Sequence, residues 1–483
     1  MKSITRYFIG EWEGDLVRKV DRKTKRLGVF LIGCFLFISF LFPASILANQ
    51  KETKSVSQKI LEILIEKRII TESQYKELKR QAEQEEAADK SKVVAGFNKG
   101  FYLETADKQS KIKLTGRFHG DFKSYLGDHP DHASFFVRRA RLSLAGTLHK
   151  YYDFTIEPEF GKGGSGLNDG FINIRYFPKA QLTFGQFKTP FSMEELHSDN
   201  WIDFIERSIA NKLAPSRDLG IMLHGGLKDE LLYYQLGVFN GYKLNKASDP
   251  DSGKDLALRL VIAPFKSSSV NAMQGLRFGA ALTHGRVELA EADWWNSGDF
   301  KTAAGTTYLG MKNGVVHDGD RTRGGVELYW DWGSTALKGE YIVTKLDGLK
   351  MGSMENDFDI RGGYLSLSHC LTGEKFVYKN GKPGRIIPRE KFEPGSGKWG
   401  AFQIGARYEF LKADKSLLDL GYVDSTQYTD KASGITLGLN WYPNEMVRFM
   451  LNYYHIKFDD SIAVSGERID NEDAVLTRFE LVF

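Results

Sequence analysis

The sequence predicts an all-β protein, a sixteen-stranded antiparallel transmembrane β-barrel preceded by a short α-helical hairpin, and three observations support this fold class. The first is the closing stretch, in which one side of a two-residue repeat carries Val475, Thr477, Phe479, Leu481 and Phe483. Such alternation suits a barrel wall, because the wall presents one row of side chains to lipid and the next row to a watery lumen. A final strand that ends on an aromatic residue is also typical of outer-membrane barrels.

Composition is the second observation. At 483 residues, with 42% hydrophobic and 13% aromatic residues, the chain is long enough for one large barrel and too polar for a bundle of membrane helices. It contains two cysteines, Cys34 and Cys370. Because we expect Cys34 to be removed with a leader, internal disulfides and cysteine-based zinc sites are excluded, and no cofactor is expected.

The first 48 residues have the order of a secretory signal peptide. A basic cluster precedes the single long apolar run, residues 27–42, and small residues follow it as far as Ala48. We expect cleavage of residues 1–48; the alternatives are a retained membrane anchor or a lipid on Cys34. This segment carries eight of the 66 basic and four of the 62 acidic residues, so 58 of each sign remain. The balanced remainder gives no reason to expect nucleic acid as a partner.

Residues 49–95 are expected to form a periplasmic helical hairpin with coiled-coil character. Apolar residues recur at helical spacing in its first half, at Val56, Ile60, Leu61, Leu64 and Ile65. Thr71-x-x-Gln74 is a capping box that begins a second helix. Two such helices are too short to bury a core alone, so we expect them to pack on copies of themselves or on another partner. A loosely ordered spacer is the alternative.

The third observation is a series of alternating strands within residues 96–483, the predicted barrel. Candidate strands begin near residues 111, 134, 151, 168, 179, 218, 231, 254, 274, 322, 334, 358, 399, 434, 446 and 474. Their number is even, which is consistent with closure. Connections alternate between tight turns and long loops, and the loops are predicted at residues 188–217, 285–321, 411–433 and 458–473. Residues 370–398 break this rule, so either a strand is miscounted or a periplasmic turn is elaborated.

Residues 135–146 carry a row of arginines. Alternation places Arg139, Arg141 and Ser143 on one face and leucines on the other, so two guanidinium groups should project into the lumen. Guanidinium groups hold phosphate or carboxylate through paired hydrogen bonds and keep their charge. Strict parity places Arg138 on the leucine face, where charge facing lipid is costly. It must therefore lie near the rim, on a bulge, or beside a loop that folds against it.

The connection at residues 188–217 is expected to fold inward. A barrel of this size has a wide lumen, so discrimination among solutes needs a segment that narrows it. The charges of this connection are mixed, with cations at Lys188, Arg207, Lys212 and Arg217 and acids at Glu194, Glu195, Asp199, Asp203 and Glu206. The alternative is a loop that only covers the barrel mouth.

Motifs for other chemistry are weak. Neither Gly-x-Ser-x-Gly nor His-Glu-x-x-His occurs, so we propose no catalytic constellation. His129 and His132 have no third ligand nearby in the sequence and indicate a solvated loop rather than a metal site. An embedded hydrolase with its Ser, His and acid on separate strands is not excluded by the sequence.

Several stretches together resemble the phosphate-selective porins of types O and P. The matching stretches occur in the same order within residues 97–483, and they include residues 136–142, 185–191, 204–208, 237–241, 371–374 and 437–442. The resemblance implies a sixteen-stranded, trimeric channel with arginines along its wall and an anion site at its constriction. By position it assigns the paired binding arginines to Arg138 and Arg139, a lumen acid to Asp169, a wall arginine to Arg117 and the arginine of the infolded loop to Arg207.

The chain departs from that pattern in the infolded loop. Glu195 and Asn200 stand where the phosphate-binding members have lysines, and Lys188 stands where they have an aromatic residue. The resemblance therefore implies the fold more firmly than it implies selectivity for phosphate.

We expect an outer-membrane porin, not an enzyme, that passes small hydrophilic solutes, including anions such as phosphate, by passive diffusion. The residues expected along its solute pathway are Arg117, Arg138, Arg139, Arg141, Asp169, Lys188 and Arg207. Its expected partners are outer-membrane lipid, small anionic solutes and further copies of itself in a homotrimer. The alternatives are a general porin with little selectivity, a barrel-embedded enzyme whose plugged lumen conducts nothing, and a structural protein that tethers the envelope through its helical hairpin.

Overall fold

The computed structural model describes residues 56–90, 92–161, 164–241, 252–291 and 299–483. The chain divides into two compact units, with the boundary between Ala88 and Asp89. The predicted signal peptide, residues 1–48, lies outside the described residues. Among the helices of the described part, none has the length and apolar character needed to cross a membrane.

The first unit contains two helices, α2 (Val56–Glu66) and α3 (Glu72–Lys90). The predicted capping box is present before α3. The Thr71 backbone N–H donates to Gln74 Oε1 at 2.9 Å, and the Gln74 N–H donates to Thr71 Oγ1 at 3.3 Å. Ile60 on α2 remains 51% exposed, so this unit leaves apolar surface uncovered.

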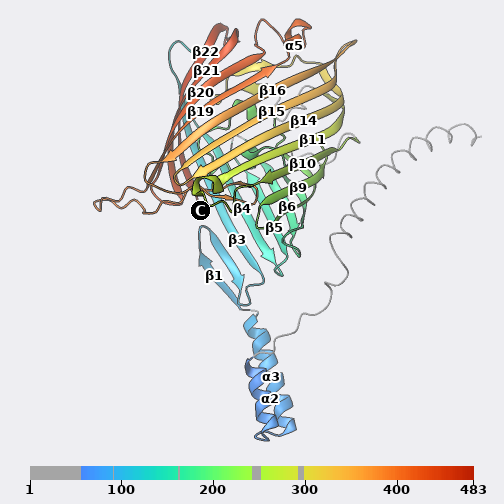
Figure 1. The fold of residues 1–483 in the computed structure, drawn as a ribbon, viewed down its shortest axis with the longest axis vertical. Coiled ribbons are helices and arrows are strands. Elements are labelled where there is room, and N and C mark those ends of the chain that lie inside the picture. The colour runs from blue at the N-terminus through green and yellow to red at the C-terminus, as the bar shows by residue number, and fades with distance from the viewer. Residues whose placement is uncertain (1–55, 91, 162–163, 242–251, 292–298) are drawn as a thin grey trace, which may run out of the picture. The chain divides into compact units, whose positions relative to one another are not determined.

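The second unit is a closed barrel of sixteen antiparallel strands, as predicted (Figure 1). In chain order the barrel strands are β3 (Lys111–Tyr125), β4 (Ser134–Leu148), β5 (Tyr152–Glu159), β6 (Gly166–Ile174), β7 (Gln181–Lys188), β8 (Arg217–Leu227), β9 (Leu232–Phe239), β10 (Asp255–Ile262), β11 (Leu276–Glu291), β14 (Val315–Trp332), β15 (Thr335–Met351), β16 (Met354–Cys370), β19 (Ala401–Ala413), β20 (Lys431–Tyr442), β21 (Val447–Val464) and β22 (Glu467–Val482). The last strand pairs with the first, from Ala474↔Tyr125 to Val482↔Arg117. Closure leaves no open edge in the wall, which a lipid environment requires.

Along much of the wall, the barrel strands separate an apolar outer face from a polar inner face. In β10, Leu256, Leu258 and Leu260 are exposed on the outside, whereas Asp255 and Arg259 are buried on the lumen side. This two-residue period is the pattern from which the strands were predicted. It repeats in β22, so the charged row of each strand points into the lumen.

Successive connections alternate between the two rims, and each rim has both short and long connections. At one end, here called the loop rim, the connections are residues 126–133, 160–165, 189–216, 240–254, 292–314, 352–353, 414–430 and 465–466. At the other end, called the turn rim, they are residues 149–151, 175–180, 228–231, 263–275, 333–334, 371–400 and 443–446. Several connections contain short helices of their own, among them η3 (Asn271–Gly275) and α5 (Ser416–Asp419).

Two predicted loops are shorter than expected. The prediction of a loop over residues 458–473 is wrong, because β21 continues to Val464 and β22 begins at Glu467. The loop predicted over residues 285–321 is likewise narrowed by β11 and β14 to residues 292–314. A hairpin that extends beyond the lipid needs no alternating apolar row, so its polar residues did not indicate a strand.

The connection at residues 189–216, here called the infolded loop, enters the lumen from the loop rim. It contains α4 (Met193–Leu196) and the 3-10 helix η2 (Ile209–Leu213). Wall residues hold it through its main chain: the Ile205 N–H donates to Asn452 Oδ1 at 2.6 Å, and the Ile209 N–H donates to Glu409 Oε2 at 2.8 Å. A second loop-rim hairpin, β12 (Asp299–Lys301) with β13 (Thr307–Gly310), joins the apolar core that packs inside the barrel at this rim.

Residues 371–400 form an elaborated turn at the turn rim, which resolves the parity problem without a miscounted strand. This segment, here called the turn-rim insert, contains β17 (Tyr378–Lys379) and β18 (Lys382–Pro383). Phe376 and Ile386 pack in an apolar cluster with wall residues of β15, β16, β19 and β20. Part of the insert therefore packs inside the barrel, whereas most of residues 387–399 are exposed.

A further hairpin, β1 (Val93–Phe97) with β2 (Phe101–Thr105), was not predicted as strands. β2 pairs with β3 from Phe101↔Leu114 to Glu104↔Lys111, just past the point where β22 ends against Arg117. The hairpin thus continues the sheet beyond the carboxyl end of the closing strand (Figure 1).

Candidate functional site

A β-bulge places Arg138 beside Arg139 at the lumen. In the β3–β4 ladder His119 pairs with Arg139, and the next pair, formed by Gly120, skips Arg138. Arg138 also contacts the infolded loop, where its Nε and Nη2 donate to the two carboxylate oxygens of Glu206 at 2.6 and 2.8 Å. Two of the positions that the sequence left open for Arg138, a bulge and a neighbouring loop, therefore occur together.

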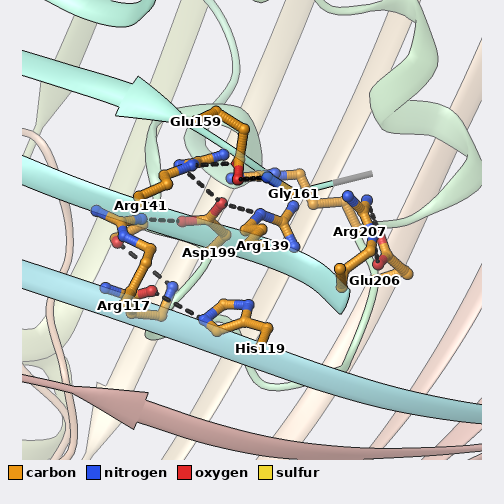
Figure 2. Close-up of polar contacts among 12 residues, drawn as sticks. Arg117, His119, Arg139, Arg141, Glu159, Gly161, Asp199, Glu206 and Arg207 are labelled. Atoms are coloured by element: carbon orange, nitrogen blue, oxygen red, sulfur yellow. Dashed lines mark hydrogen bonds and ion pairs between the residues drawn. The ribbon is translucent and has the colours of Figure 1, made fainter. Parts of the chain in front are cut away.

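Asp199 of the infolded loop lies among three arginines of the wall (Figure 2). Arg117 Nη1 donates to Asp199 Oδ1 at 2.5 Å, Arg141 Nη1 lies 3.3 Å from Oδ2, and Arg139 Nε forms an ion pair with the same oxygen. Arg117 and Arg141 are register partners on β3 and β4, which brings the guanidinium groups together. Three residues predicted for the solute pathway thus converge on one loop carboxylate.

Strand β5 supplies two more carboxylates to this cluster. Glu157 accepts from Arg117 Nη2 at 2.8 Å and from Arg141 Nη1 at 3.3 Å. Glu159 accepts from Arg141 Nε at 2.5 Å. Within the described residues, Arg139 forms an ion pair with neither Glu157 nor Glu159. Asp199 is the only carboxylate there that forms an ion pair with Arg139.

A second cluster is centred on Glu195 of α4. Its carboxylate lies 3.6 Å from Lys188 Nζ and 3.5 Å from Arg207 Nε, and it accepts a hydrogen bond from Asn211 Nδ2 at 2.9 Å. Lys188 also donates to the Glu195 backbone carbonyl. The two predicted cations Lys188 and Arg207 are therefore brought together by an acid of the infolded loop.

Asp169 and a wall arginine complete the network of paired charges. Arg217 donates to the two carboxylate oxygens of Asp169 at 2.8 and 3.1 Å. On β22, Arg478 donates to both oxygens of Asp121 at 2.8 Å and to the Ile205 carbonyl at 2.7 Å. Arg478 was not predicted as a site residue, although its place opposite the outward Phe479 row was a signal that it faces the lumen.

Two acids of the infolded loop, Asp199 and Glu195, are held in their charged form. Burial alone raises the pKa of Asp199, but Arg139, Arg117 and Arg141 outweigh it and hold that pKa well below its usual range. Burial likewise opposes ionisation of Glu195, yet Arg207 and Lys188 lower its pKa to about 2. At neutral pH the infolded loop therefore presents fixed negative charge to a positive wall.

Two cavities border the infolded loop. The loop-rim cavity, of about 610 Å³, and the turn-rim cavity, of about 850 Å³, each receive residues from this loop. The charged residues lining the loop-rim cavity are Lys123, Arg138, Arg207, Lys212, Lys301, Glu195 and Glu206. Those lining the turn-rim cavity are Lys111, Lys113, Arg117, Arg175, Lys188, Arg217, Lys382, Asp153, Asp169 and Asp199. Both cavities carry more basic than acidic side chains.

The turn-rim insert meets the infolded loop inside the barrel. His197 Nε2 of the infolded loop lies 3.2 Å from the Gly384 carbonyl oxygen, and the Arg385 guanidinium lies 5.1 Å from the centre of the Trp201 ring. The insert is also held to the wall, where Arg259 Nη2 donates to the Gly381 carbonyl at 2.8 Å. The lumen is thus narrowed from both rims.

Metal ligation finds no support in the part of the chain that the structure describes, where no group of three or more His, Cys, Asp or Glu side chains could hold an ion. His129 stacks on Tyr125, with ring centres 3.8 Å apart, and its Nε2 lies 3.7 Å from Glu472. The first histidine of the His129-x-x-His132 pair therefore has aromatic and acidic neighbours within the protein.

Comparison with known proteins decides the family. The model of the family described as phosphate-selective porin O and P matches residues 112–483. The chain belongs to this family. This porin is 26% identical over 425 residues to Porin O of Pseudomonas aeruginosa, an alignment that covers 82% of this chain and 93% of that protein.

Solved structures of other outer-membrane proteins are similar at lower identity. The in-vitro folded trimer form of OmpT from Vibrio cholerae has a TM-score of 0.49 at 9% identity, covering 77% of this porin and 99% of that chain. The anion-selective porin from Comamonas acidovorans has a TM-score of 0.48 at 12% identity, covering 77% of this porin and all of that chain, 100%.

Family membership makes this porin a channel of the Gram-negative outer membrane and not an enzyme. The structure shows which contacts are made at the positions where the sequence departs from the family pattern. Lys188 contacts Glu195, and the Asn200 side-chain oxygen lies 3.1 Å from His119 Nε2. These departures are therefore built into the packing of the infolded loop.

Proposed function

We propose that this porin passes small hydrophilic solutes by diffusion and favours anions through the net positive charge of its two lumen cavities. The loop-rim cavity is lined by five Lys or Arg and two acidic side chains, and the turn-rim cavity by seven and three. An excess of one sign in a narrow, low-dielectric passage raises the local concentration of the opposite ion and lowers its barrier. This excess is the observation that carries the proposal.

The paired charges at the infolded loop favour a modest preference rather than strong phosphate binding. Arg138 pairs with Glu206, Arg139 with Asp199, and Lys188 with Glu195. A guanidinium group that already holds a carboxylate has fewer donors left for a passing anion. A general porin with little selectivity is therefore the second candidate, and the same ion pairs support it.

The test is the reversal potential of the purified protein in a planar bilayer under a potassium chloride gradient. We expect a potential of the sign that anion preference gives, and a smaller one for the Lys113→Gln, Lys382→Gln double variant of the turn-rim cavity. Arg286→Gln is the matched control, because Arg286 is 52% exposed and lines neither cavity. A zero potential in the unchanged protein supports the general porin, and a cation preference contradicts the anion proposal.

We also propose a homotrimer with the helical unit, residues 49–95, in the periplasm. Apolar side chains that the helices leave exposed, Ile60 at 51% and Ile63 at 49%, support packing against other copies. Chemical cross-linking of the mature protein in detergent should give trimers, and removal of residues 56–90 should weaken them. N-terminal sequencing of protein from outer membranes tests removal of residues 1–48, with a mature start near residue 49 as the expected result.

A further inference from the structure

The position of Asp199 is that of a bound anion. Its side chain is 7% exposed, and the side chains of Arg139 and Arg141 around it are 6% and 7% exposed. Arg117 approaches one carboxylate oxygen, and Arg139 and Arg141 approach the other (Figure 2). Such an arrangement is a carboxylate-binding site whose occupant comes from the protein itself.

Arg139 depends on this occupant most strongly. Its neighbours Arg117 and Arg141 have Glu157 as a further partner, and Arg141 also has Glu159. Within the described residues, the buried Arg139 Nη1 makes no hydrogen bond. The guanidinium group of Arg139 is therefore a buried cation with unused donor capacity beside Asp199, which lines the turn-rim cavity.

We propose that Asp199 is a built-in counter-ion that occupies a carboxylate site formed by Arg117, Arg139 and Arg141, and that this occupancy prevents the porin from binding the carboxylate solutes that it passes. The proposal rests on the proposed function, since it names the residue that keeps an anion-favouring channel free of a tight anion site. A tethered carboxylate competes at high effective concentration. A passing solute therefore meets arginines whose charge is already paired with the Asp199 carboxylate.

Removal of the Asp199 charge should open the site. Asp199→Asn keeps the size of the side chain and one acceptor oxygen for Arg117, while it leaves Arg139 without an ion-pair partner. A solute carboxylate can then enter and accept hydrogen bonds from the same guanidinium groups. The variant channel should favour anions more strongly than the unchanged channel, and succinate should block its current.

Asp153→Asn is the matched control. Asp153 lines the same turn-rim cavity, so its removal changes the cavity charge by the same amount. Its partners lie elsewhere, however: it accepts from Thr147 Oγ1 at 2.7 Å and pairs with Arg175 at 3.2 Å. The control therefore separates the charge of the cavity from the site formed by the three arginines.

The experiment records single-channel currents of the full mature protein and both variants, with succinate titrated from micromolar to tens of millimolar. The proposal expects succinate to block Asp199→Asn at a concentration at least tenfold lower than it blocks the unchanged protein or Asp153→Asn. Equal shifts in reversal potential for both variants, without block, would mean that only cavity charge changed and would overturn it. Unchanged currents in Asp199→Asn would also overturn it.

Two further measurements keep the result interpretable. Asp199→Glu retains the charge on a side chain longer by one methylene, and its currents should resemble those of the unchanged protein. Asp199→Ser serves as the neutral variant if Asp199→Asn does not fold. The reversal potential of the unchanged protein tests the proposed function by itself, so a cation preference there contradicts that function while the block in the variant still decides the role of Asp199.

Discussion

The infolded loop and the turn-rim insert both enter the lumen, but different interactions hold them there. The infolded loop is held by buried ion pairs of its side chains, with Asp199 among wall arginines and Glu206 against Arg138, besides the main-chain hydrogen bonds of Ile205 and Ile209. The turn-rim insert is held by apolar packing of Phe376 and Ile386 and by main-chain contacts, such as the Gly381 carbonyl that accepts from Arg259. The position of a segment held by ion pairs depends on single acidic residues. The position of a segment held by packing and main-chain contacts depends on its shape.

The largest expected effect follows from removing a wall cation beneath the infolded loop. Arg478→Ala leaves Asp121 buried without its guanidinium partner, because Asp121 is 3% and Arg478 about 1% exposed. Breaking a buried pair on one side costs about 3–5 kcal/mol. The free energy of unfolding, measured by urea titration of protein refolded in lipid vesicles, should fall by that amount. Arg286→Ala on the exposed surface should change it by less than about 0.5 kcal/mol, and an equal loss in both variants would contradict a charge-held loop.

A pH titration tests the same loop at its second anchor. The pKa of Glu195 is about 2 in the folded protein against an ordinary 4.5, with burial opposed by Arg207 and Lys188. A lowered carboxyl pKa stabilises the protein at pH above 4.5, and this contribution is lost as the pH falls from 4.5 toward 2. Glu195→Gln should therefore cost about 3 kcal/mol at pH 7, a difference from the unchanged protein that disappears toward pH 2. Glu393→Gln, in an exposed side chain outside the infolded loop, is the matched control.

Shape rather than charge should control the turn-rim insert. Gly381 has a φ of +70°, and a Cβ there would lie 2.4 Å from the Tyr233 ring. Gly381→Ala should lower the free energy of unfolding by more than the roughly 1–2 kcal/mol that a left-handed backbone costs a residue with a side chain. It should also alter the conductance, because the insert around Gly381 must move away from Tyr233. Gly395→Ala shares the left-handed backbone, with a φ of +79°, but meets no atom within 4 Å. Equal conductance in the two variants would show that the insert around Gly381 does not shape the solute pathway.

The smallest expected effect concerns the contact between the infolded loop and the turn-rim insert. His197→Ala removes one hydrogen bond to the Gly384 carbonyl and should cost about 1 kcal/mol. Combined with Gly381→Ala, it should give a coupling energy of at least about 0.5 kcal/mol, measured in the same urea titration. His369→Ala, on the outer face beside Thr335, should give none. Full additivity at His197 would mean that the two segments act independently.

Most of the wall was predictable from the sequence because alternation reports directly on lipid and lumen. The sixteen strands match the predicted set in number and order. The prediction failed where strands leave the lipid, as in the hairpin around Ser465 and Gly466, and in the short strands β1 and β2, whose five residues each give too few repeats of the pattern. Strand identity thus follows the membrane environment more closely than it follows propensity.

The lumen was predictable only in part. Parity identified Arg139 and Arg141 as inward residues, and Arg138 as an exception that required a bulge or a loop. It could not pair them with Asp199, which is 58 residues beyond Arg141 in the sequence, because that contact depends on how the infolded loop crosses the lumen. The sequence shows that the loop contains acidic residues. Only the tertiary structure shows which basic residues they pair with.

The main-chain contacts of the turn-rim insert bear on how this porin can diverge from its relatives. Arg259 and His197 contact the carbonyl oxygens of Gly381 and Gly384, and every residue type carries such an oxygen. Side chains of the insert that lie outside its apolar cluster with Phe376 and Ile386 can therefore vary over evolution while the insert keeps its place in the lumen. Gly381 is the exception, since its backbone and its neighbour Tyr233 leave no room for a side chain. Among homologues, the position of the insert should be inherited more faithfully than its sequence.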